Sequence, residues 1–358
     1  MSKKVAIIGT VGLPSKYGGF ETLAEYLTKY LGADLDMTVY CSAKSYDKHL
    51  KNYNDVRLEY INLNANGIQS IPYDIISIFK ALSYADTLLI LGVSGCIVLP
   101  VIKLISNKKI IVNIDGLEWK RAKWNKYAKW FLKFSEKIAV KVADITVTDN
   151  KVIQEYVLSE YGKDSKLIAY GADHVNKLTI TDEVYQKYIF LKKEYAFTVC
   201  RIEPENNIHI ILEAMSSQEK YPLVMIGNWN SSSYGKELRE KYKDFEHIYL
   251  LDPIYKQDIL DQLRSNCYFY LHGHSAGGTN PSLVEAMALG LAVIAYDVNY
   301  NRETTDNKAL YFKKSPDLVN LIDKITENDL YKISNDMLKV AHQRYTWKHI
   351  SKAYYEIL

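Results

Sequence analysis

The 358-residue sequence has few cysteines and little net charge, and each shortage excludes a class of protein. Its four cysteines lie far apart, with neither the spacing of a zinc site nor that of a redox motif. A net charge of +3 is too small to indicate a nucleic-acid-binding protein, so any basic surface has to be local. The opening residues MSKKVAIIG lead into an apolar strand without a signal peptide, and we expect a cytoplasmic protein.

The sequence also lacks a clean apolar run long enough to cross a membrane. Its most apolar segment, residues 87–106, is broken by two glycines, a proline and a lysine, whereas a bilayer needs about 20 consecutive apolar residues. We predict instead a buried strand over 87–91, then a loop and a core helix. No internal repeat with a period of roughly 20 to 50 residues is visible, which disfavours a solenoid.

Short apolar runs alternate with segments of helical periodicity along the chain. In the first half the predicted strands are KVAIIG, MTVYCS, TLLILG, KIIVNID, ITVTD and KLIAYG. After a polar stretch they are AFTVCRI, YPLVMIG, HIYLL, CYFYLHG, LAVIAYD and ALYF. Strands that alternate with helices form parallel sheets with crossover helices. The pattern therefore predicts an α/β protein with two doubly wound halves.

The stretch HGHSAGGTNPSLVEAMALG places glycines and an Asn-Pro pair directly before a helix, beyond the end of a strand, where such sheets bind ligands. We interpret Asn280 as the N-cap and Pro281 as the first helical residue, which leaves the N–H groups of Ser282 and Leu283 unpaired and facing an anion. Glu285, one turn later, is suited to accept hydrogen bonds from sugar hydroxyls. These features predict a site for a nucleotide diphosphate and its ribose. A capped structural helix with a surface glutamate is the alternative.

Other strand ends carry matching groups. Gly18 and Gly19 stand between the first strand and a helix, where the backbone can meet a phosphate or a sugar, although a helix cap also explains them. This loop lacks the glycine spacing of a dinucleotide fingerprint, which disfavours hydride chemistry. Arg201 follows a strand and is suited either to neutralise a diphosphate or to form a surface salt bridge. Carboxylates end two further predicted strands, namely Asp115, with Glu118 after it, and Glu303.

The motifs YGGFETL, NIDGLEWKRAKWN, RIEPENN, GGTNPSLVEAM and NRETTDNKALYF, in this order, resemble those of the retaining glycosyltransferases of family 4. They resemble in particular the bacterial rhamnosyltransferases that build surface polysaccharides. The resemblance covers nearly the whole chain and implies the GT-B fold, in which two doubly wound Rossmann-like domains face each other across a cleft. It implies an acceptor-binding domain at 1–175, onto which a helix at about 345–358 packs back, and a nucleotide-sugar-binding domain at 176–344.

The resemblance also assigns roles to the candidate residues. Glu285 becomes the ribose-binding carboxylate, Arg201 the cation that faces the diphosphate, and Asp115 the group that orients the acceptor or the donor sugar. Gly18 and Gly19 form the loop beneath the diphosphate. The other implied donor-binding residues are Asn206, His274, Gly278, Thr279, Asn280, Ser282, Leu283 and Glu303. Glu21 and Glu118 are assigned to the acceptor side.

The sequence departs from the family pattern at three positions. Gly277 stands where many members have a glutamate, Asn206 where many have a phosphate-binding lysine, and Asp115 where many have a histidine. The first change removes a hydroxyl acceptor from the sugar pocket, which is consistent with a 6-deoxy-L-sugar donor such as dTDP-rhamnose. No Asp-x-Asp motif is suited to a diphosphate, so we expect no metal cofactor. The alternatives are a UDP-hexose transferase or a sugar-nucleotide 2-epimerase of the same fold, or a non-catalytic sugar-nucleotide-binding assembly subunit.

Residues 120–141 combine many basic side chains and aromatics with a single acid, Glu136. The basic residues are Lys120, Arg121, Lys123, Lys126, Lys129, Lys133, Lys137 and Lys141, and the aromatics are Trp124, Tyr127, Trp130, Phe131 and Phe134. Such a helix favours the headgroups of an anionic membrane. We therefore predict a peripheral protein at the inner face of the cytoplasmic membrane, with an undecaprenyl-diphosphate-linked saccharide as acceptor in O-antigen or capsule synthesis. A solvated helix that packs Phe131, Phe134 and Ile138 into the core is the alternative.

Overall fold

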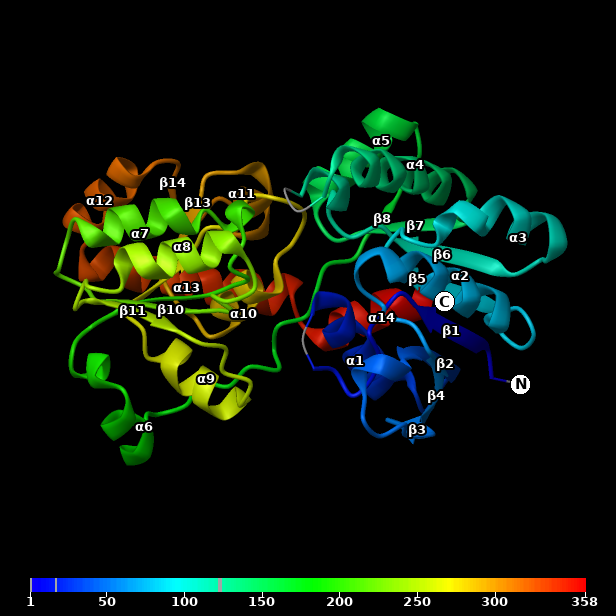
Figure 1. Ribbon diagram of the computed structural model, residues 1–358, viewed down its shortest axis with the longest axis horizontal. Coiled ribbons are helices and arrows are strands. Elements are labelled where there is room, and N and C mark those ends of the chain that lie inside the picture. The colour runs from blue at the N-terminus through cyan, green and yellow to red at the C-terminus, as the bar shows by residue number, and fades with distance from the viewer. Residues whose placement is uncertain (1, 17, 122–123) are drawn as a thin grey trace. The chain divides into compact units, whose positions relative to one another are not determined.

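Strands and helices alternate along both halves of the chain. The computed structural model describes residues 2–16, 18–121 and 124–358 and divides the chain into two units (Figure 1). Unit 1 comprises the chain up to Gly171 together with Trp347–Leu358, and unit 2 comprises Ala172–Thr346. Each unit contains one largely parallel sheet flanked by helices, which confirms the predicted fold class of two doubly wound α/β domains.

The sheet of unit 1 has eight strands in the order β3-β4-β2-β1-β5-β6-β7-β8, and all its pairings are parallel except that of β3 with β4. The strands are β1 Lys4–Ile8, β2 Asp36–Ser42, β3 Asn52–Tyr53, β4 Val56–Ile61, β5 Thr87–Leu91, β6 Lys109–Asn113, β7 Ile145–Thr148 and β8 Lys166–Leu167. The α-helices are α1 Gly19–Leu31, α2 Ser70–Ala81, α3 Leu99–Ile105, α4 Lys126–Val142, α5 Lys151–Tyr161 and α14 Trp347–Ile357. Short 3-10 helices are η1 Ala43–Ser45, η2 Gly67–Gln69, η3 Cys96–Val98 and η4 Glu118–Lys120.

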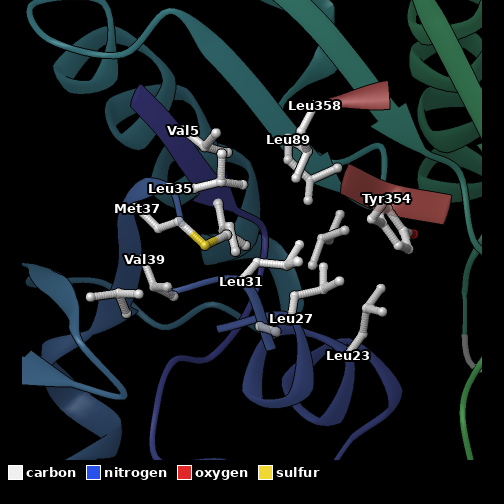
Figure 2. Packing of buried hydrophobic residues seen from close by; sticks show 14 of the residues in the cluster. Val5, Leu23, Leu27, Leu31, Leu35, Met37, Val39, Leu89, Tyr354 and Leu358 are labelled. Atoms are coloured by element: carbon white, nitrogen blue, oxygen red, sulfur yellow. The ribbon is translucent and has the colours of Figure 1, made fainter. Parts of the chain in front are cut away.

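Both faces of this sheet are covered, which explains why its central strands are continuous apolar runs. Side chains alternate along a strand, so one set of each strand's side chains faces α1 and α14, which pack against each other. Figure 2 shows Leu23, Leu27 and Leu31 of α1 directed at these strand side chains, with Tyr354 and Leu358 at the same core. Right-handed crossovers place α2, α3, α4 and α5 on the opposite face.

The sheet of unit 2 has six parallel strands in the order β11-β10-β9-β12-β13-β14. They are β9 Ala196–Val199, β10 Leu223–Ile226, β11 Ile248–Leu251, β12 Phe269–His272, β13 Val293–Tyr296 and β14 Leu310–Phe312. The α-helices are α6 Asp182–Lys187, α7 Ile208–Ser216, α8 Ser233–Tyr242, α9 Gln257–Ser265, α10 Pro281–Ala288, α11 Asn299–Thr304, α12 Ser315–Lys324 and α13 Glu327–Arg344. Two 3-10 helices, η5 Ile189–Lys192 and η6 Pro204–Asn206, complete the unit as described.

The apolar segment 87–106 forms β5, a loop with η3, and α3. The prediction of a core helix at its end is wrong for the outer face of α3. Leu99 and Ile102 are buried against the sheet, but Leu104 is 85% exposed and Ile105 61% exposed. The apolar composition of α3 did not reveal the exposure of Leu104 and Ile105. A helix that covers a sheet has one side turned away from it, whatever side chains that side carries. Within the described ranges, no helix is both long and apolar enough to cross a membrane.

The first prediction concerns the attachment of α14 to unit 1. Trp347 is buried and stacks on Tyr26 with ring centroids 4.4 Å apart, and a Cβ at Gly171 would lie 2.4 Å from its ring. Trp347→Ala should therefore destabilise unit 1 by about 3 to 5 kcal/mol, measured by urea denaturation. The control Tyr355→Ala, at an exposed position of the same helix, should cost less than about 1 kcal/mol. Equal small losses for both variants would contradict this packing.

Candidate functional site

Helix α10 begins as the sequence predicts, with Asn280 as its N-cap and Pro281 as its first residue. The Asn280 side-chain oxygen accepts the Ser282 N–H at 3.0 Å, and its backbone carbonyl accepts the Leu283 N–H at 3.0 Å. The prediction that these two N–H groups are unpaired is therefore wrong. The asparagine that marks the start of the helix also binds the groups that were expected to face a ligand. A diphosphate at this position has to displace Asn280 or bind the preceding loop.

Three predicted donor-site residues meet at the carboxyl ends of β9 and β12. The Asn206 side-chain amide donates to the Arg201 carbonyl at 2.7 Å, and its oxygen lies 2.8 Å from Nδ1 of His274. Because an amide oxygen can only accept, Nδ1 of His274 carries the proton in this arrangement. Gly273 is required here, since a Cβ at that position would lie 2.0 Å from the Asn206 carbonyl oxygen. The loop after β12 is thus fixed against η6.

Two buried asparagines that the sequence analysis missed support the same loop. The Asn207 side chain donates to the Gly273 carbonyl at 2.8 Å. The Asn301 side chain, from α11, donates to the carbonyls of His274 and Tyr296 at 2.8 and 2.9 Å. Both lie in or beside motifs that were quoted for the family resemblance. The motifs did not show that these side chains bind backbone carbonyls.

The loop between β12 and α10 holds the remaining donor-site candidates. Gly277 has a φ of 106°, a backbone conformation that favours glycine. Gly278 is half-buried, and Thr279 is buried just before the N-cap. A glutamate at position 277 would be strained, so the departure from the family pattern has a backbone consequence as well as a chemical one.

Glu285 is engaged by a buried arginine. Its Oε2 accepts a hydrogen bond from the guanidinium of Arg264, whose side chain is fully buried and also binds Asp261 at 3.0 Å. Its Oε1 lies 3.2 Å from Nε2 of His174. Burial raises the pKa of Glu285, but Arg264 and His174 outweigh that effect and lower the pKa to about 2. No motif in the sequence pointed to Arg264, which belongs to the amphipathic helix α9.

This arrangement limits what Glu285 can do chemically. A carboxylate with a pKa of about 2 is ionised at neutral pH, so it accepts hydrogen bonds and cannot serve as a general acid. A ribose hydroxyl that binds Glu285 has to use a lone pair that Arg264 leaves open on Oε2 or His174 leaves open on Oε1, or displace one of these partners. The carboxylate is thus a fixed acceptor, and each of its oxygens already has one protein partner.

Glu303 does not lie at the end of a strand, and that prediction is wrong. Strand β13 ends at Tyr296, and Glu303 belongs to α11. Its carboxylate pairs with the guanidinium of Arg344 at the end of α13, and Arg344 also donates to the Glu303 carbonyl at 3.0 Å. The segment NYNRET was placed wrongly because strand β13 is short and the chain turns directly into a helix.

In unit 1, the loop between β1 and α1 is held by two carboxylates one helical turn apart. Oε1 of Glu21 accepts the Val11 N–H at 2.7 Å, and Glu25 accepts the Ser15 N–H at 2.8 Å. Gly18 has a φ of 132°, and a Cβ there would lie 1.9 Å from Oε2 of Glu21, so only glycine fits. Gly19 begins α1. Glu21, predicted on the acceptor side, therefore positions the glycine loop.

Asp115 follows β6 with a left-handed backbone, φ 59°, which is uncommon for a non-glycine residue. The Asn113 side-chain oxygen accepts the Asp115 N–H at 2.9 Å, and the Tyr170 hydroxyl donates to its carboxylate at 3.3 Å. Burial and the neighbouring carboxylate raise the pKa of Tyr170, so this hydroxyl stays protonated. The polar groups around Asp115 hold a strained conformation in place.

The other unit 1 candidates lie along the loop after β6 and on α4. Glu118 binds the guanidinium of Arg121 at 3.1 Å and the indole N–H of Trp124 at 3.0 Å, so these three residues fix the loop. Lys120 is exposed beside them, and Trp130 is exposed on α4. Lys123 lies outside the described residues.

Two family models match the chain. Residues 2–173 match a domain of unknown function, DUF1972, and residues 181–344 match "Glycosyl transferases group 1". The candidate donor-site residues from Arg201 to Glu303 lie within the second match. The comparison with curated proteins gave no match.

Comparison with solved structures shows the fold of the whole chain. Sucrose-phosphate synthase from Thermosynechococcus elongatus has a TM-score of 0.83 at 14% identity, over 99% of this chain and 98% of that chain. HepE from Anabaena, in complex with UDP-glucose, has a TM-score of 0.78 at 15% identity, over 100% and 99%. A glycosyltransferase from Rickettsia africae has a TM-score of 0.75 at 16% identity, over 99% of this chain and 97% of that chain. These likenesses confirm the GT-B fold, and the rhamnosyltransferase resemblance stays a prediction.

The second prediction tests the ion pair between Glu285 and Arg264 in unit 2. A carboxyl whose pKa is about 2 in the folded state and 4.5 ordinarily stabilises the fold above 4.5, and this stabilisation is lost as the pH falls from 4.5 toward 2. The difference in free energy of unfolding between wild type and Glu285→Gln should thus shrink between about pH 5 and about pH 3. Urea denaturation across pH measures it. Glu237→Gln, at an exposed position of α8, is the control, and a constant Glu285→Gln difference would contradict the ion pair.

Proposed function

We propose that this protein is a glycosyltransferase that takes a sugar from a nucleotide-sugar donor bound by unit 2. The observation that carries the proposal is the fixed, ionised carboxylate of Glu285 beside the end of a parallel sheet in a glycosyl transferases group 1 domain. An acceptor-only group of this kind is matched to the hydroxyl donors of a ribose. The likeness to GT-B structures, one of them in complex with UDP-glucose, supports the same class of substrate.

The diphosphate is assigned to the residues at the ends of β9 and β12. Arg201 supplies a guanidinium, and the loop with Gly277 and Gly278 supplies backbone N–H groups that a phosphate can approach closely. Asn206 keeps the Arg201 carbonyl and the His274 ring in place. Because the Ser282 and Leu283 N–H groups are bound to Asn280, the guanidinium and this loop carry more of the charge than the helix start does.

The chemistry proposed is transfer with retention, as the family resemblance implies. The bond between the anomeric carbon and the departing diphosphate breaks, and the acceptor hydroxyl bonds to that carbon on the same face. Its proton passes to the departing phosphate. Fixed positive charge stabilises the negative charge that grows on the leaving group, which is where most of the rate acceleration arises. Asp115 orients the acceptor or the donor sugar.

The finer assignment is a rhamnosyltransferase of O-antigen or capsule synthesis. The resemblance of the motifs to that branch supports it, as does Gly277 in place of a glutamate that would bind hydroxyls of an ordinary hexose. In this proposal the donor is dTDP-rhamnose, no metal is required, and the acceptor is an undecaprenyl-diphosphate-linked saccharide. The enzyme then works in the cytoplasm, peripherally at the inner face of the membrane. A UDP-hexose donor is the second candidate, favoured by the likeness to HepE in complex with UDP-glucose.

The third prediction separates the donor classes and the role of Arg201. In a thermal-shift panel of dTDP-, UDP- and GDP-sugars, dTDP-rhamnose should stabilise the protein most. Arg201→Ala should lower turnover of the best donor on a lipid-diphosphate saccharide by about 100- to 1,000-fold. It should leave binding of the bare nucleoside unchanged, because the nucleoside has no phosphate. Arg239→Ala, which breaks an exposed ion pair with Asp252, is the matched control.

Two results count against this proposal. Unchanged turnover in Arg201→Ala would remove the diphosphate assignment. Stabilisation by UDP-glucose with none by dTDP-rhamnose would replace the rhamnosyl donor with a hexosyl one.

The fourth prediction tests Asp115 without disturbing its backbone. Asparagine tolerates a left-handed conformation about as well as aspartate, so Asp115→Asn removes the charge and keeps the fold. Turnover should fall by about 100-fold while the Kd for the nucleotide sugar stays the same, because the donor nucleotide is assigned to unit 2. Single-turnover kinetics and calorimetry measure the two quantities. Full turnover in Asp115→Asn would exclude a role for this carboxylate in the reaction.

A further inference from the structure

Helix α4 presents aromatic side chains to solvent along one stripe. Tyr127, Trp130 and Phe134, followed by Lys137 and Lys141, recur at intervals of three and four residues and so lie on one side of the helix. Tyr127 is 83% exposed and Trp130 is 68% exposed, and the rings of Trp130 and Phe134 stack. The opposite side of α4 is buried against the rest of unit 1. Phe134 therefore does not pack into the core, as the alternative interpretation of this helix required.

The one acidic residue of α4 does not offset the charge of this stripe. Glu136 is buried and accepts hydrogen bonds from Tyr156 and Tyr161 at 2.6 Å each and from Trp119 at 3.1 Å. Lys133 is drawn inward beside it and pairs with Glu160 at 3.0 Å. The outward side of α4 thus carries aromatic rings and lysines, while its carboxylate faces the protein.

Helix α3 adds aliphatic side chains to the same layer. It packs against α4 on the face of the sheet that α2 to α5 cover (Figure 1). Its residues Leu99 and Ile102 face the sheet, and Val101, Leu104 and Ile105 face away from it. The outward sides of two neighbouring helices therefore both carry apolar side chains. Those of α3 lie toward the C-terminal end of α4, where Lys103 binds Asp144 at 2.6 Å, and the aromatic rings lie in the N-terminal half of α4. We call the residues Val101, Leu104, Ile105, Tyr127, Trp130, Phe134, Lys126, Lys137 and Lys141 the α3–α4 face.

We propose that the α3–α4 face docks onto an anionic lipid bilayer, with α3 and the aromatic end of α4 among the headgroups and acyl boundary. Aliphatic side chains on α3 and aromatic side chains on α4, with Lys137 and Lys141 between them along α4, are complementary to a surface that is apolar below and negatively charged above. Helix α3 has only seven residues, and its exposed Val101, Leu104 and Ile105 can insert individually between lipid headgroups. This inference extends the peripheral location in the proposed function, which rests on sequence alone, by naming the inserting residues.

The charges argue against a second copy of this chain as the occupant. In a two-fold symmetric dimer the same patch meets itself, so Lys126, Lys137 and Lys141 of both copies would enter one interface, and no carboxylate is among the residues of the α3–α4 face. Like charges brought together in an apolar interface are destabilising. A bilayer with anionic headgroups removes that repulsion and pairs each lysine with a phosphate.

The test is flotation of the full-length protein with vesicles, in the absence of donor and acceptor. Vesicles of phosphatidylcholine alone are compared with vesicles that also contain phosphatidylglycerol. The wild type should float with the anionic vesicles. Leu104→Ser/Ile105→Ser and, separately, Tyr127→Ser/Trp130→Ser should each lower the partition coefficient by at least about tenfold. Lys137→Gln/Lys141→Gln should lower it on the order of tenfold, and only for the anionic vesicles.

The matched control replaces two equally exposed apolar residues of unit 2, Ile189→Ser/Tyr331→Ser, and should float like the wild type. All substituted positions are exposed, and circular dichroism checks that each variant is folded. Absence of wild-type flotation with anionic vesicles would overturn the proposal. So would equal flotation of all variants, or sedimentation data in which the Leu104→Ser/Ile105→Ser variant alone loses a dimer.

The proposed function fails separately from this inference. Turnover on a short-chain, water-soluble acceptor should be the same for the Leu104→Ser/Ile105→Ser variant and the wild type, because neither residue belongs to the donor or acceptor assignments. Vesicle binding without any glycosyl transfer would leave the docking surface standing and remove the enzymatic proposal.

Discussion

The burial of both faces of each parallel sheet is the constraint on which the rest of the structure depends. Helices cover these faces, so side chains along the strands are apolar and polar groups collect where strands end. Arg201, His274 and Asp115 all stand just beyond the carboxyl end of a strand. The strands before these residues are covered on both faces, so charged and polar side chains are placed at the strand ends, where a ligand can reach them.

Polar groups crowded at a strand end have to be satisfied by each other. Asn207 and Asn301 bind the carbonyls of the loop after β12, and Asn280 binds the N–H groups of the helix that follows. Glu285 binds Arg264. Each of these hydrogen bonds fixes the position of a ligand-binding group, and each also takes up hydrogen-bonding capacity that a ligand would otherwise use. The site is therefore rigid, and only part of its hydrogen-bonding capacity is open to a donor.

The fold was predictable from the sequence because it follows from local patterns. Every apolar run that was predicted as a strand contains one, but two strands were missed. They are the two-residue edge strand Asn52–Tyr53 and its neighbour Val56–Ile61, in which exposed and buried residues alternate. The types and order of the candidate site residues were predictable too. Their partners were not, because Arg264 and His174 reach Glu285 from segments that are distant in the sequence. The N–H groups of Ser282 and Leu283 were wrongly predicted to be unpaired for a related reason. The asparagine that marks the start of the helix as its N-cap also accepts hydrogen bonds from these N–H groups.

The same limit explains why α3 was read as a core helix. Hydrophobicity measures how much apolar surface a segment carries, and only the packing decides which side of that segment meets the sheet. In α3 the buried side is satisfied by Leu99 and Ile102, so the apolar residues on the other side contribute nothing to the core. An apolar side that the fold does not require is a cost to solubility. Because α3 packs against α4, which carries exposed lysines and aromatic rings, its exposed apolar side favours a partner outside the chain. An anionic bilayer can bind the lysines and the apolar side chains of both helices together.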